Sequence, residues 1–256
     1  MKKRLKDKVI IVAGAGTALE GVGNGKACAV QFAREGARVV CADINESAAQ
    51  ATVKTIQKEG GEAVSCQADM LNASDIKRVI ETCLNKYGKI DVLHNNIGVP
   101  GGGEIIDIDG ETWDRVFNIN TKTMFLACKM VLPYMIENQG GCIINVSSIA
   151  SHRPLPDAAY VASKGAVDSL TRYIAARYGR YNIRANVLLL GYIDTPLARP
   201  AWEIEKIKQI NLRQVPLRRF ASPWEVATVA AFLASDEASY INGVILPVDG
   251  GLCTSL

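Results

Sequence analysis

Short apolar runs alternate with longer segments of helical composition along the whole chain. The runs that predict strands are residues 8–13, 37–42, 62–67, 90–94, 142–146, 183–189 and 243–248. The segments that predict helices are residues 26–35, 45–59, 73–87, 111–132, 157–178 and 222–234. Because strands that alternate with helices form parallel sheets, the pattern predicts an α/β fold.

Composition narrows the class of protein. The 256 residues fit one domain spanning 1–256, since no linker-like stretch interrupts them, and 48% hydrophobic with 21% charged residues is typical of a globular protein. The net charge is only +3, with no basic cluster beyond residues 2–4, so we expect no nucleic-acid partner.

The apolar run 9–13 is too short for a signal-peptide core or a membrane span, which predicts a cytoplasmic protein without a membrane partner. The seven cysteines are scattered without metal-site spacing, so we expect mostly buried thiols and no metal site.

The strongest candidate for chemistry is the pair Tyr160 and Lys164, which share one face of a predicted helix. A phenol with a pKa of about 10 is a poor base at neutral pH, but a neighbouring ammonium favours its ionised form. Ser148 follows the buried run 142–146 and would lie at the carboxyl end of a strand, where open α/β sheets form active sites. There it could donate a hydrogen bond to a substrate oxygen. The alternative is an exposed helical pair without function.

A glycine-rich turn follows the first predicted strand. Gly14 follows that strand directly, and Gly23 and Gly25 precede the first predicted helix. Backbone N–H groups in such a turn can approach a pyrophosphate. The gap between Gly14 and Gly23 is longer than in the usual dinucleotide fingerprint, so a flexible surface loop is an equal alternative.

Asp43 ends the second predicted strand, near the distance from the first glycines at which an acid meets the adenosine ribose. Its charge favours a 2′-hydroxyl over a 2′-phosphate, and Ile44 and Asn45 follow it instead of an arginine. The pattern therefore predicts NAD over NADP. The alternative is that Asp43 caps the helix beginning near Glu46.

Other polar residues lie at strand ends or within apolar segments. Asp69 follows a strand and could accept from an adenine amino group or serve a turn, while the loop 95–98 could reach a nucleotide or tie strands together. His94 lies within an apolar run and is interpreted as a hydrogen-bonded core histidine. Asn118 and Asn120 interrupt the predicted helix 111–132, and a buried asparagine needs backbone or water partners.

The segment 196–215 is predicted to cover the substrate. It is helix-like but mixed in polarity between Pro196 and Pro216, as in a movable lid, although a fixed surface helix fits equally well. No paired arginines or lysines near the site indicate a phosphate or a carboxylate on the substrate. The candidate substrate contacts besides Ser148 and Tyr160 are Ile149, His152, Leu155, Tyr192, Leu197 and Trp202.

Taken together, these motifs make the sequence similar to the classical short-chain dehydrogenase/reductase family over nearly its whole length, from Lys8 to Gly251. The matching landmarks are the glycine-rich turn, Asp69, the loop 95–98, Asn120, Ser148, the Tyr160 and Lys164 pair, and the turn 191–196. The resemblance implies a single-domain, Rossmann-like, doubly wound parallel sheet of about seven strands with helices on both faces. It also implies a homotetramer.

Residue roles follow from the same resemblance. Tyr160 would be the acid/base, Ser148 would polarise the substrate oxygen, and Lys164 would lower the tyrosine pKa and bind the nicotinamide ribose. Asn120 would hold a relay water; it is chosen over Asn118 because of the position of Phe125. The implied cofactor contacts are Gly14, Gly23 and Gly25 at the pyrophosphate, Asp43 at the adenosine ribose, Asp69 at the adenine, Asn96 at the ribose region, Thr195 at the carboxamide, and also Gly98, Gly191, Ile193, Tyr160 and Lys164.

The chain departs from the family pattern in several places. Ala13 stands where threonine is usual, and Ile97 replaces a small alanine. Leu190 replaces the proline before Gly191, the glycine loop is extended at 16–21, and the interval from Ser148 to Tyr160 is one residue shorter than common.

The implied activity is hydride transfer between NAD and a secondary alcohol or ketone carbon. One alternative is enoyl reduction, because relatives that reduce carbon–carbon double bonds also carry a stretched glycine loop. Their tyrosine and lysine are usually further apart than Tyr160 and Lys164. Another alternative is a dinucleotide-sensing protein without activity, which would usually have lost the tyrosine or the lysine.

Overall fold

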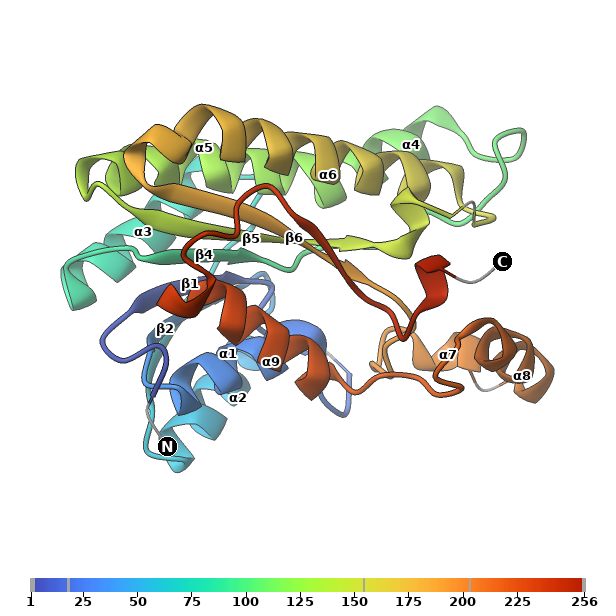
Figure 1. The fold of residues 1–256 in the computed structure, drawn as a ribbon, viewed down its shortest axis with the longest axis horizontal. Helices are drawn as coiled ribbons and strands as arrows, with labels where there is room; N and C mark the ends of the chain where they lie inside the picture. Colours follow the sequence, from blue (N-terminus) through green and yellow to red (C-terminus); the bar gives the residue numbers. More distant parts are fainter. Residues whose placement is uncertain (1–2, 18, 154, 203, 255–256) are drawn as a thin grey trace.

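The protein forms one parallel sheet covered by helices on both faces (Figure 1). The computed structural model describes residues 3–17, 19–153, 155–202 and 204–254, without the side chains of Ala201 and Trp202. Within this described part the seven strands have the order β3-β2-β1-β4-β5-β6-β7. They are β1 (Val9–Ala13), β2 (Arg38–Asp43), β3 (Glu62–Gln67), β4 (Val92–Asn95), β5 (Gly141–Ser148), β6 (Ile183–Leu190) and β7 (Ile245–Val248). The predicted α/β class and parallel sheet are confirmed.

The strand order reverses beside β1, and this reversal determines where a ligand can enter. Ala13, the last residue of β1, is paired with Ala42 of β2 on one side and with Asn95 of β4 on the other. The chain leaves β1 toward one face of the sheet and leaves β4 toward the opposite face, so the carboxyl ends of these two neighbouring strands open a crevice at this switch point. Gly14 follows Ala13 directly into that position.

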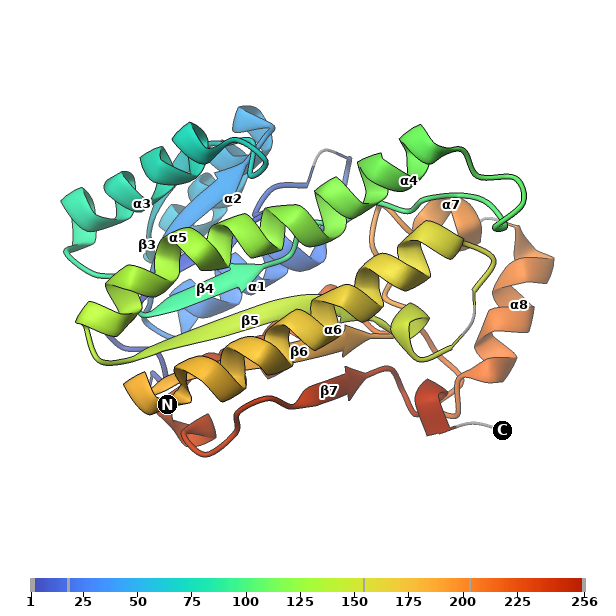
Figure 2. The ribbon, with the colours of Figure 1, turned by 90° about the horizontal axis from the view of Figure 1, so that it is seen from above.

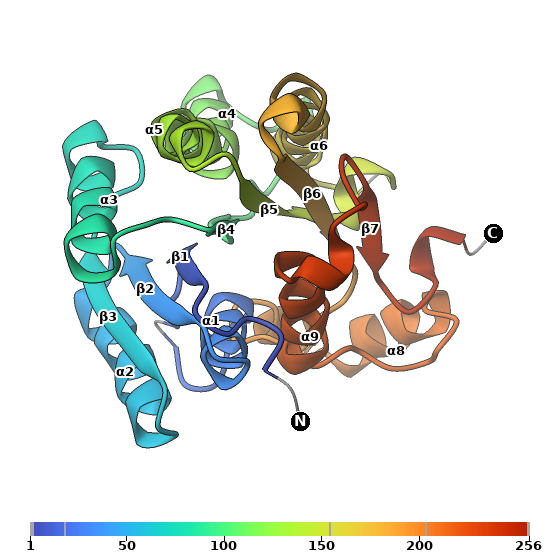
Figure 3. The same ribbon diagram turned by 60° about the vertical axis from the view of Figure 1, so that its left-hand side comes forward.

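Alternate residues of the strands build two apolar cores, one on each face of the sheet. The helices in the described part of the chain are α1 (Asn24–Arg34), α2 (Glu46–Lys58), α3 (Ala73–Tyr87), α4 (Gly110–Phe117), α5 (Thr123–Glu137), α6 (Ala158–Tyr178), α7 (Arg199–Trp202), α8 (Glu205–Gln214) and α9 (Pro223–Ala234). Ile10 and Val12 point into the core beneath α1, α2 and α9, whereas Val9 and Ile11 point into the core beneath α3, α5 and α6. Figure 3 shows these two helical layers on opposite sides of the strands.

Local capping signals set several helix ends. The Asn72 side chain accepts from the Ser74 N–H at the start of α3, and Gly88 ends that helix in the left-handed conformation. Ser222 and Glu225 form a capping box at the start of α9. At α2 the cap is Asn45, so the alternative that Asp43 caps this helix is wrong.

The predicted single helix 111–132 is wrong in its interior and at its end. The structure has α4, a π-helical turn (Asn118–Lys122) and α5, which continues to Glu137 through Pro133. The wide turn directs the Asn120 amide onto a neighbouring backbone segment, a contact that the local sequence does not reveal. The helix extends past Pro133 because its last turns bury Met135 in the core.

His94 is buried as predicted, but the expected hydrogen bond is absent. Its ring meets the edge of Phe32 at 5.6 Å between centroids, and neither ring nitrogen has a partner within the described part of the chain. Burial lowers the pKa of His94 to about 3, so the ring is neutral. The apolar surroundings explain the error, because they offer packing but no acceptor.

The cysteines follow the expectation of buried thiols. Six of the seven are buried, Cys253 is partly exposed, and burial is the main cause that raises the pKa of Cys28 and Cys128. None of the helices in the described part of the chain combines the length and the apolarity that a membrane crossing needs.

Candidate active site

Four polar side chains from three separate elements come together at the carboxyl end of the sheet. Ser148 is the last residue of β5, Tyr160 and Lys164 lie on α6, and Asn120 lies in the π-helical turn between α4 and α5. Figure 2 shows the start of α6 above the tips of β5 and β6, next to α4. The fold therefore assembles the four predicted catalytic residues in one region.

Asp157 fixes the orientation of the helix that carries the phenol. It is the N-cap of α6, and its Oδ1 accepts from the Tyr160 N–H at 3.1 Å. Its Oδ2 accepts from the N–H groups of Gly101 and Gly102 at 2.8 and 3.0 Å. Tyr160 consequently lies in the first turn of α6, where the helix dipole favours a negative charge. The sequence did not predict the contact of Asp157 with Gly101 and Gly102, because these glycines are far from Asp157 along the chain.

Lys164 is buried beside Tyr160. Only 3% of Lys164 is exposed, its Nζ donates to the Val146 carbonyl at 3.0 Å, and the Nζ lies 5.7 Å from the centre of the Tyr160 ring. A Cβ added at Gly98 would be 3.1 Å from this Nζ, so the glycine leaves the space that the ammonium occupies. Burial lowers the pKa of Lys164 to about 8, and the charge of Asp168 opposes this effect.

The residues around Tyr160 do not by themselves favour the ionised form of its phenol. Burial raises the pKa of Tyr160 above its ordinary value, a hydrogen bond with Ser148 opposes this, and the charge of Asp157 adds to it. The expected lowering of the phenol pKa by Lys164 is therefore not seen, because burial outweighs the favourable contacts. A lower pKa needs more positive charge near the ring than these residues supply.

Asn120 closes the loop after β4 over the site. It is completely buried, its Oδ1 accepts from the Val99 N–H at 2.7 Å, and its Nδ2 donates to the Val99 carbonyl at 3.0 Å. The Nδ2 also donates to Ser163 Oγ on α6 at 3.0 Å. The backbone contact is one of the two kinds of partner that the sequence left open. Ser163, which the sequence reasoning did not single out, links this loop to the helix of Tyr160.

The glycine-rich turn packs closely on itself at the switch point. Gly14 has a φ of +80°, and a Cβ at Gly25 would lie 1.8 Å from the Gly14 carbonyl oxygen and 2.7 Å from Asn96 Nδ2. Asn96 Nδ2 donates to the same carbonyl at 3.2 Å. Helix α1 begins after Gly23, which provides no side-chain cap, so N–H groups at this helix start are available to an anion.

Asp43 lies against the glycine-rich turn. Its Oδ2 accepts from the Gly16 N–H at 2.8 Å, and its Oδ1 accepts from the Asn45 N–H at 3.0 Å. Within the described residues it has no ion pair with a lysine or an arginine. Its negative charge is therefore uncompensated at the end of β2.

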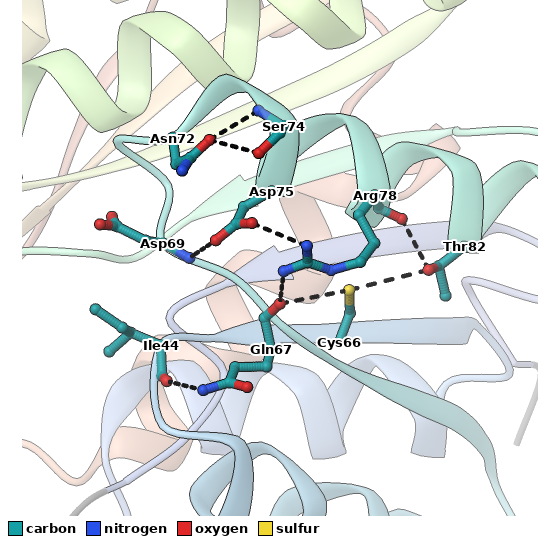
Figure 4. A network of polar contacts seen from close by, with 9 residues as sticks. All are labelled: Ile44, Cys66, Gln67, Asp69, Asn72, Ser74, Asp75, Arg78 and Thr82. Carbon is teal, nitrogen blue, oxygen red and sulfur yellow. Dashed lines mark hydrogen bonds and ion pairs between the residues drawn. The ribbon is translucent and has the colours of Figure 1, made fainter.

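Asp69 has the turn role that the sequence left open. Its Oδ1 accepts from the Leu71 N–H, and its own N–H donates to Asp75, each at 2.9 Å. Asp75 is paired with Arg78 at 2.9 Å, and Arg78 also donates to the Gln67 carbonyl (Figure 4). This network fixes the end of β3 and the start of α3 at the edge of the sheet, and the Asp69 carboxylate projects away from Asp75 (Figure 4).

The turn after β6 connects the sheet to the segment that carries α7 and α8. A Cβ at Gly191 would lie 2.6 Å from the Cα of Asp249, which explains the glycine there. Ile193 and Thr195 are buried, and Thr195 Oγ1 accepts from the Ala198 N–H at 3.3 Å. A Cβ at Gly21, in the extended glycine loop, would lie 3.0 Å from Pro196. The extension thus contacts the start of the predicted substrate-covering segment.

The predicted substrate contacts are in different environments. Ile149 is only 2% exposed and packs with Val215 and Leu252, so it supports the site from beneath. Leu155 and Tyr192 are partly buried, whereas His152 and Leu197 are exposed. The predicted contact of Trp202 lies outside the described part of the structure, which includes the backbone of this residue but not its side chain.

Comparisons with known proteins agree with this geometry. A family model described as enoyl-(acyl carrier protein) reductase matches residues 18–253. The 3-oxoacyl-(acyl-carrier-protein) reductase of Thermotoga maritima is 38% identical over 97% of this chain and 99% of its own length. The cyclopentanol dehydrogenase of a Comamonas species is 36% identical over 97% of this chain and 98% of its own.

A solved structure is similar to this chain over almost its whole length as well. The 7α-hydroxysteroid dehydrogenase complexed with NADH and 7-oxo glycochenodeoxycholic acid has a TM-score of 0.91, with 35% identity over 98% of this chain and 96% of that one. This likeness covers the sheet, the glycine-rich turn and the α6 pair together. The chain thus belongs to the classical short-chain dehydrogenase/reductase family and is an NAD(P)-dependent oxidoreductase acting on alcohols or ketones.

Proposed function

We propose that this enzyme transfers hydride between NAD and a secondary alcohol or ketone carbon, with Tyr160 as the acid/base. The observation that carries the proposal is the convergence of Ser148, Tyr160 and Lys164 at the carboxyl end of the sheet beside the glycine-rich turn. A screen of alcohols with NAD and of ketones with NADH tests this proposal, and the absorbance of the nicotinamide is its readout. Absence of turnover with every secondary alcohol and ketone, alongside normal cofactor binding, would count against it.

The chain has residues that fit a dinucleotide. The glycine-rich turn with Gly14, Gly23 and Gly25 would hold the pyrophosphate, Asp43 the adenosine ribose, and Lys164 the nicotinamide ribose. We assign the further contacts of Asp69, Asn96, Gly98, Gly191, Ile193 and Thr195 to the same cofactor. Bound NAD supplies a hydride acceptor and, when oxidised, the positive charge that the Tyr160 surroundings lack.

The protein residues then handle the proton. In alcohol oxidation the Tyr160 phenolate takes the hydroxyl proton while Ser148 donates a hydrogen bond to the same oxygen. The Lys164 ammonium stabilises the phenolate, and Asn120 connects the loop above the site to a water route. In ketone reduction the phenol returns its proton to the oxygen. The segment 196–215 covers the substrate, and its exposed Leu197 offers an apolar contact.

The cofactor preference gives a first prediction. We expect wild type to bind NAD more tightly than NADP, because the uncompensated Asp43 carboxylate repels a 2′-phosphate. Asp43→Ala should lower the ratio of NAD to NADP affinity at least about tenfold. Titration of both cofactors by fluorescence measures the ratio. Glu46→Gln, an exposed acid on α2, is the control and should leave the ratio unchanged. Wild type that binds NADP as tightly as NAD contradicts the prediction.

The outer faces of α5 and α6 lead to a second prediction. Phe125 on α5 and Tyr173 on α6 are 45% and 56% exposed, which is unusual for large apolar side chains on neighbouring helices. We propose that a homotetramer buries these faces symmetrically. Analytical ultracentrifugation at micromolar concentration should show a tetramer, and Phe125→Ser should shift it toward smaller species. A wild-type monomer under these conditions would rule it out.

Enoyl reduction is a second candidate because the matching family model carries that description and the glycine loop is extended. Lys164 lies one helical turn from Tyr160, which favours the carbonyl chemistry. The same absorbance screen decides between them if it includes enoyl thioesters and their 3-oxoacyl counterparts. Faster oxidation of NADH with the enoyl compounds would favour the second candidate.

A further inference from the structure

A buried carboxylate lies one helical turn beyond the buried lysine of the active site. Lys164 is 3% exposed and Asp168 is 6% exposed, and both lie on α6. Residues four apart share a face of a helix. Asp168 is also the one acidic residue in α6, so no other acid of this helix can balance the lysine.

Asp168 is incompletely paired. Its Oδ2 lies 3.7 Å from Nδ1 of His152, and that nitrogen also contacts Ser151 Oγ at 2.9 Å. Its Oδ1 is buried and has no hydrogen-bond partner among the residues that the structure describes. An isolated buried carboxylate is costly, so a compensating positive charge nearby is needed to explain its position.

Lys164 is also incompletely paired, because its ammonium lacks hydrogen-bond acceptors and a close counter-charge. An ammonium has three donors, and the one acceptor found for Lys164 Nζ in the described part of the chain is the Val146 carbonyl. No carboxylate lies within 4.0 Å of it among these residues, but opposite charges in a poorly hydrated interior attract over longer distances. The charge of Asp168 raises the pKa of Lys164 against the effect of burial.

The other groups around Lys164 do not provide this charge. On its own helix the other titratable group beside Lys164 is Tyr160, and the turn after β5 carries His152, which contacts Asp168. In the loop after β4, a Cβ at Gly98 would lie 3.1 Å from the Lys164 Nζ and 3.5 Å from the Asn120 Oδ1 of the π-helical turn, and both Gly98 and Asn120 are uncharged.

We propose that Asp168 is a positioning residue that keeps the Lys164 ammonium charged and in place. This inference rests on the proposed function, in which that ammonium binds the nicotinamide ribose and stabilises the Tyr160 phenolate. Asp168 contacts neither the cofactor nor the substrate, and it acts through Lys164 alone. The competing explanation is that Asp168 only anchors His152 and the turn that carries it.

The test is NADH binding measured by fluorescence across neutral and alkaline pH. Affinity should fall as pH rises through the pKa of Lys164, because the neutral amine donates more weakly to the ribose. Asp168→Asn removes the charge at constant shape, and we expect the midpoint of this fall to move down by about one pH unit. Asp168→Glu retains the charge and should keep the wild-type midpoint. Asp168→Ser replaces Asp168→Asn if that variant does not fold.

Two controls separate the alternatives. Glu237→Gln removes an exposed acid and should not move the midpoint. His152→Ala removes the imidazole that Asp168 would otherwise anchor, and it too should leave the midpoint unchanged. An unchanged midpoint in the neutral variants at Asp168, or an equal shift in His152→Ala, overturns the inference.

Lys164→Ala distinguishes this failure from a failure of the proposed function. It should weaken NADH binding and abolish the alkaline fall altogether. If Lys164→Ala instead binds NADH with the wild-type affinity and the wild-type pH dependence, the role proposed for the lysine itself is wrong.

Discussion

Replacing Tyr160 with phenylalanine should nearly abolish turnover while folding and NADH binding remain. The change keeps the ring and removes only the ionisable oxygen, and loss of a positioned acid/base costs about a hundredfold to ten-thousandfold in rate. Steady-state kinetics with a substrate found in the screen would measure the loss. Circular dichroism and NADH titration would show that the fold and the cofactor site are intact.

The pH dependence adds a mechanistic signature. Alcohol oxidation needs the phenolate, so its rate in wild type should rise with pH through the Tyr160 pKa in the enzyme–cofactor complex. The residual activity of Tyr160→Phe should lack this rising limb. Tyr178→Phe makes the same chemical change at the far end of α6 and should alter stability by no more than about 0.5 kcal/mol, with unchanged kinetics. Retention of most activity in Tyr160→Phe would show that another group is the base.

Gly25→Ala should cause the second large effect, a loss of cofactor affinity of about tenfold to a hundredfold. The added methyl would lie 1.8 Å from the Gly14 carbonyl oxygen, which is backbone and cannot rotate away. Either α1 or the glycine-rich turn must shift, and both carry N–H groups proposed to hold the pyrophosphate. Titration with NADH and with ADP measures the loss, and both ligands should be affected because they share the diphosphate.

Gly110→Ala is the matched control for this substitution. Gly110 is in the first turn of α4, and a Cβ there has no heavy atom within 4 Å. Alanine favours helix more than glycine does, so this variant should bind NADH normally and be equally or more stable. Wild-type affinity in Gly25→Ala would mean that the diphosphate does not depend on this turn.

The sequence predicted those parts of the fold that depend on nearby residues. The bounds of β3 and α3 match the predicted ranges, because Asn72 and Gly88 mark the helix ends locally. The parallel sheet followed from the alternation of elements alone. The assembly of Ser148, Tyr160 and Lys164 was predicted partly from helical spacing and partly from the family resemblance.

The remaining features depend on contacts between distant parts of the chain. The π-helical turn is explained by the contact of Asn120 with Val99, and the unpaired imidazole of His94 by packing against Phe32. The pKa of Tyr160 depends on how deeply the ring is buried, which no spacing of residues gives. Asp168 had a local signal, since it follows Lys164 by four residues, but its burial became apparent only in three dimensions.

The buried cysteines also influence how the enzyme ages. Cys28 and Cys142 lie in the core beneath α1 and α9, and Cys83 and Cys128 lie in the core on the opposite face of the sheet. Burial raises the pKa of each of these thiols, so little reactive thiolate forms while the core is closed. Oxidants can reach them only after one of the two helical layers separates from the sheet. The oxidation of these four thiols is thereby governed by the rate of unfolding, and less by the concentration of oxidant around the enzyme.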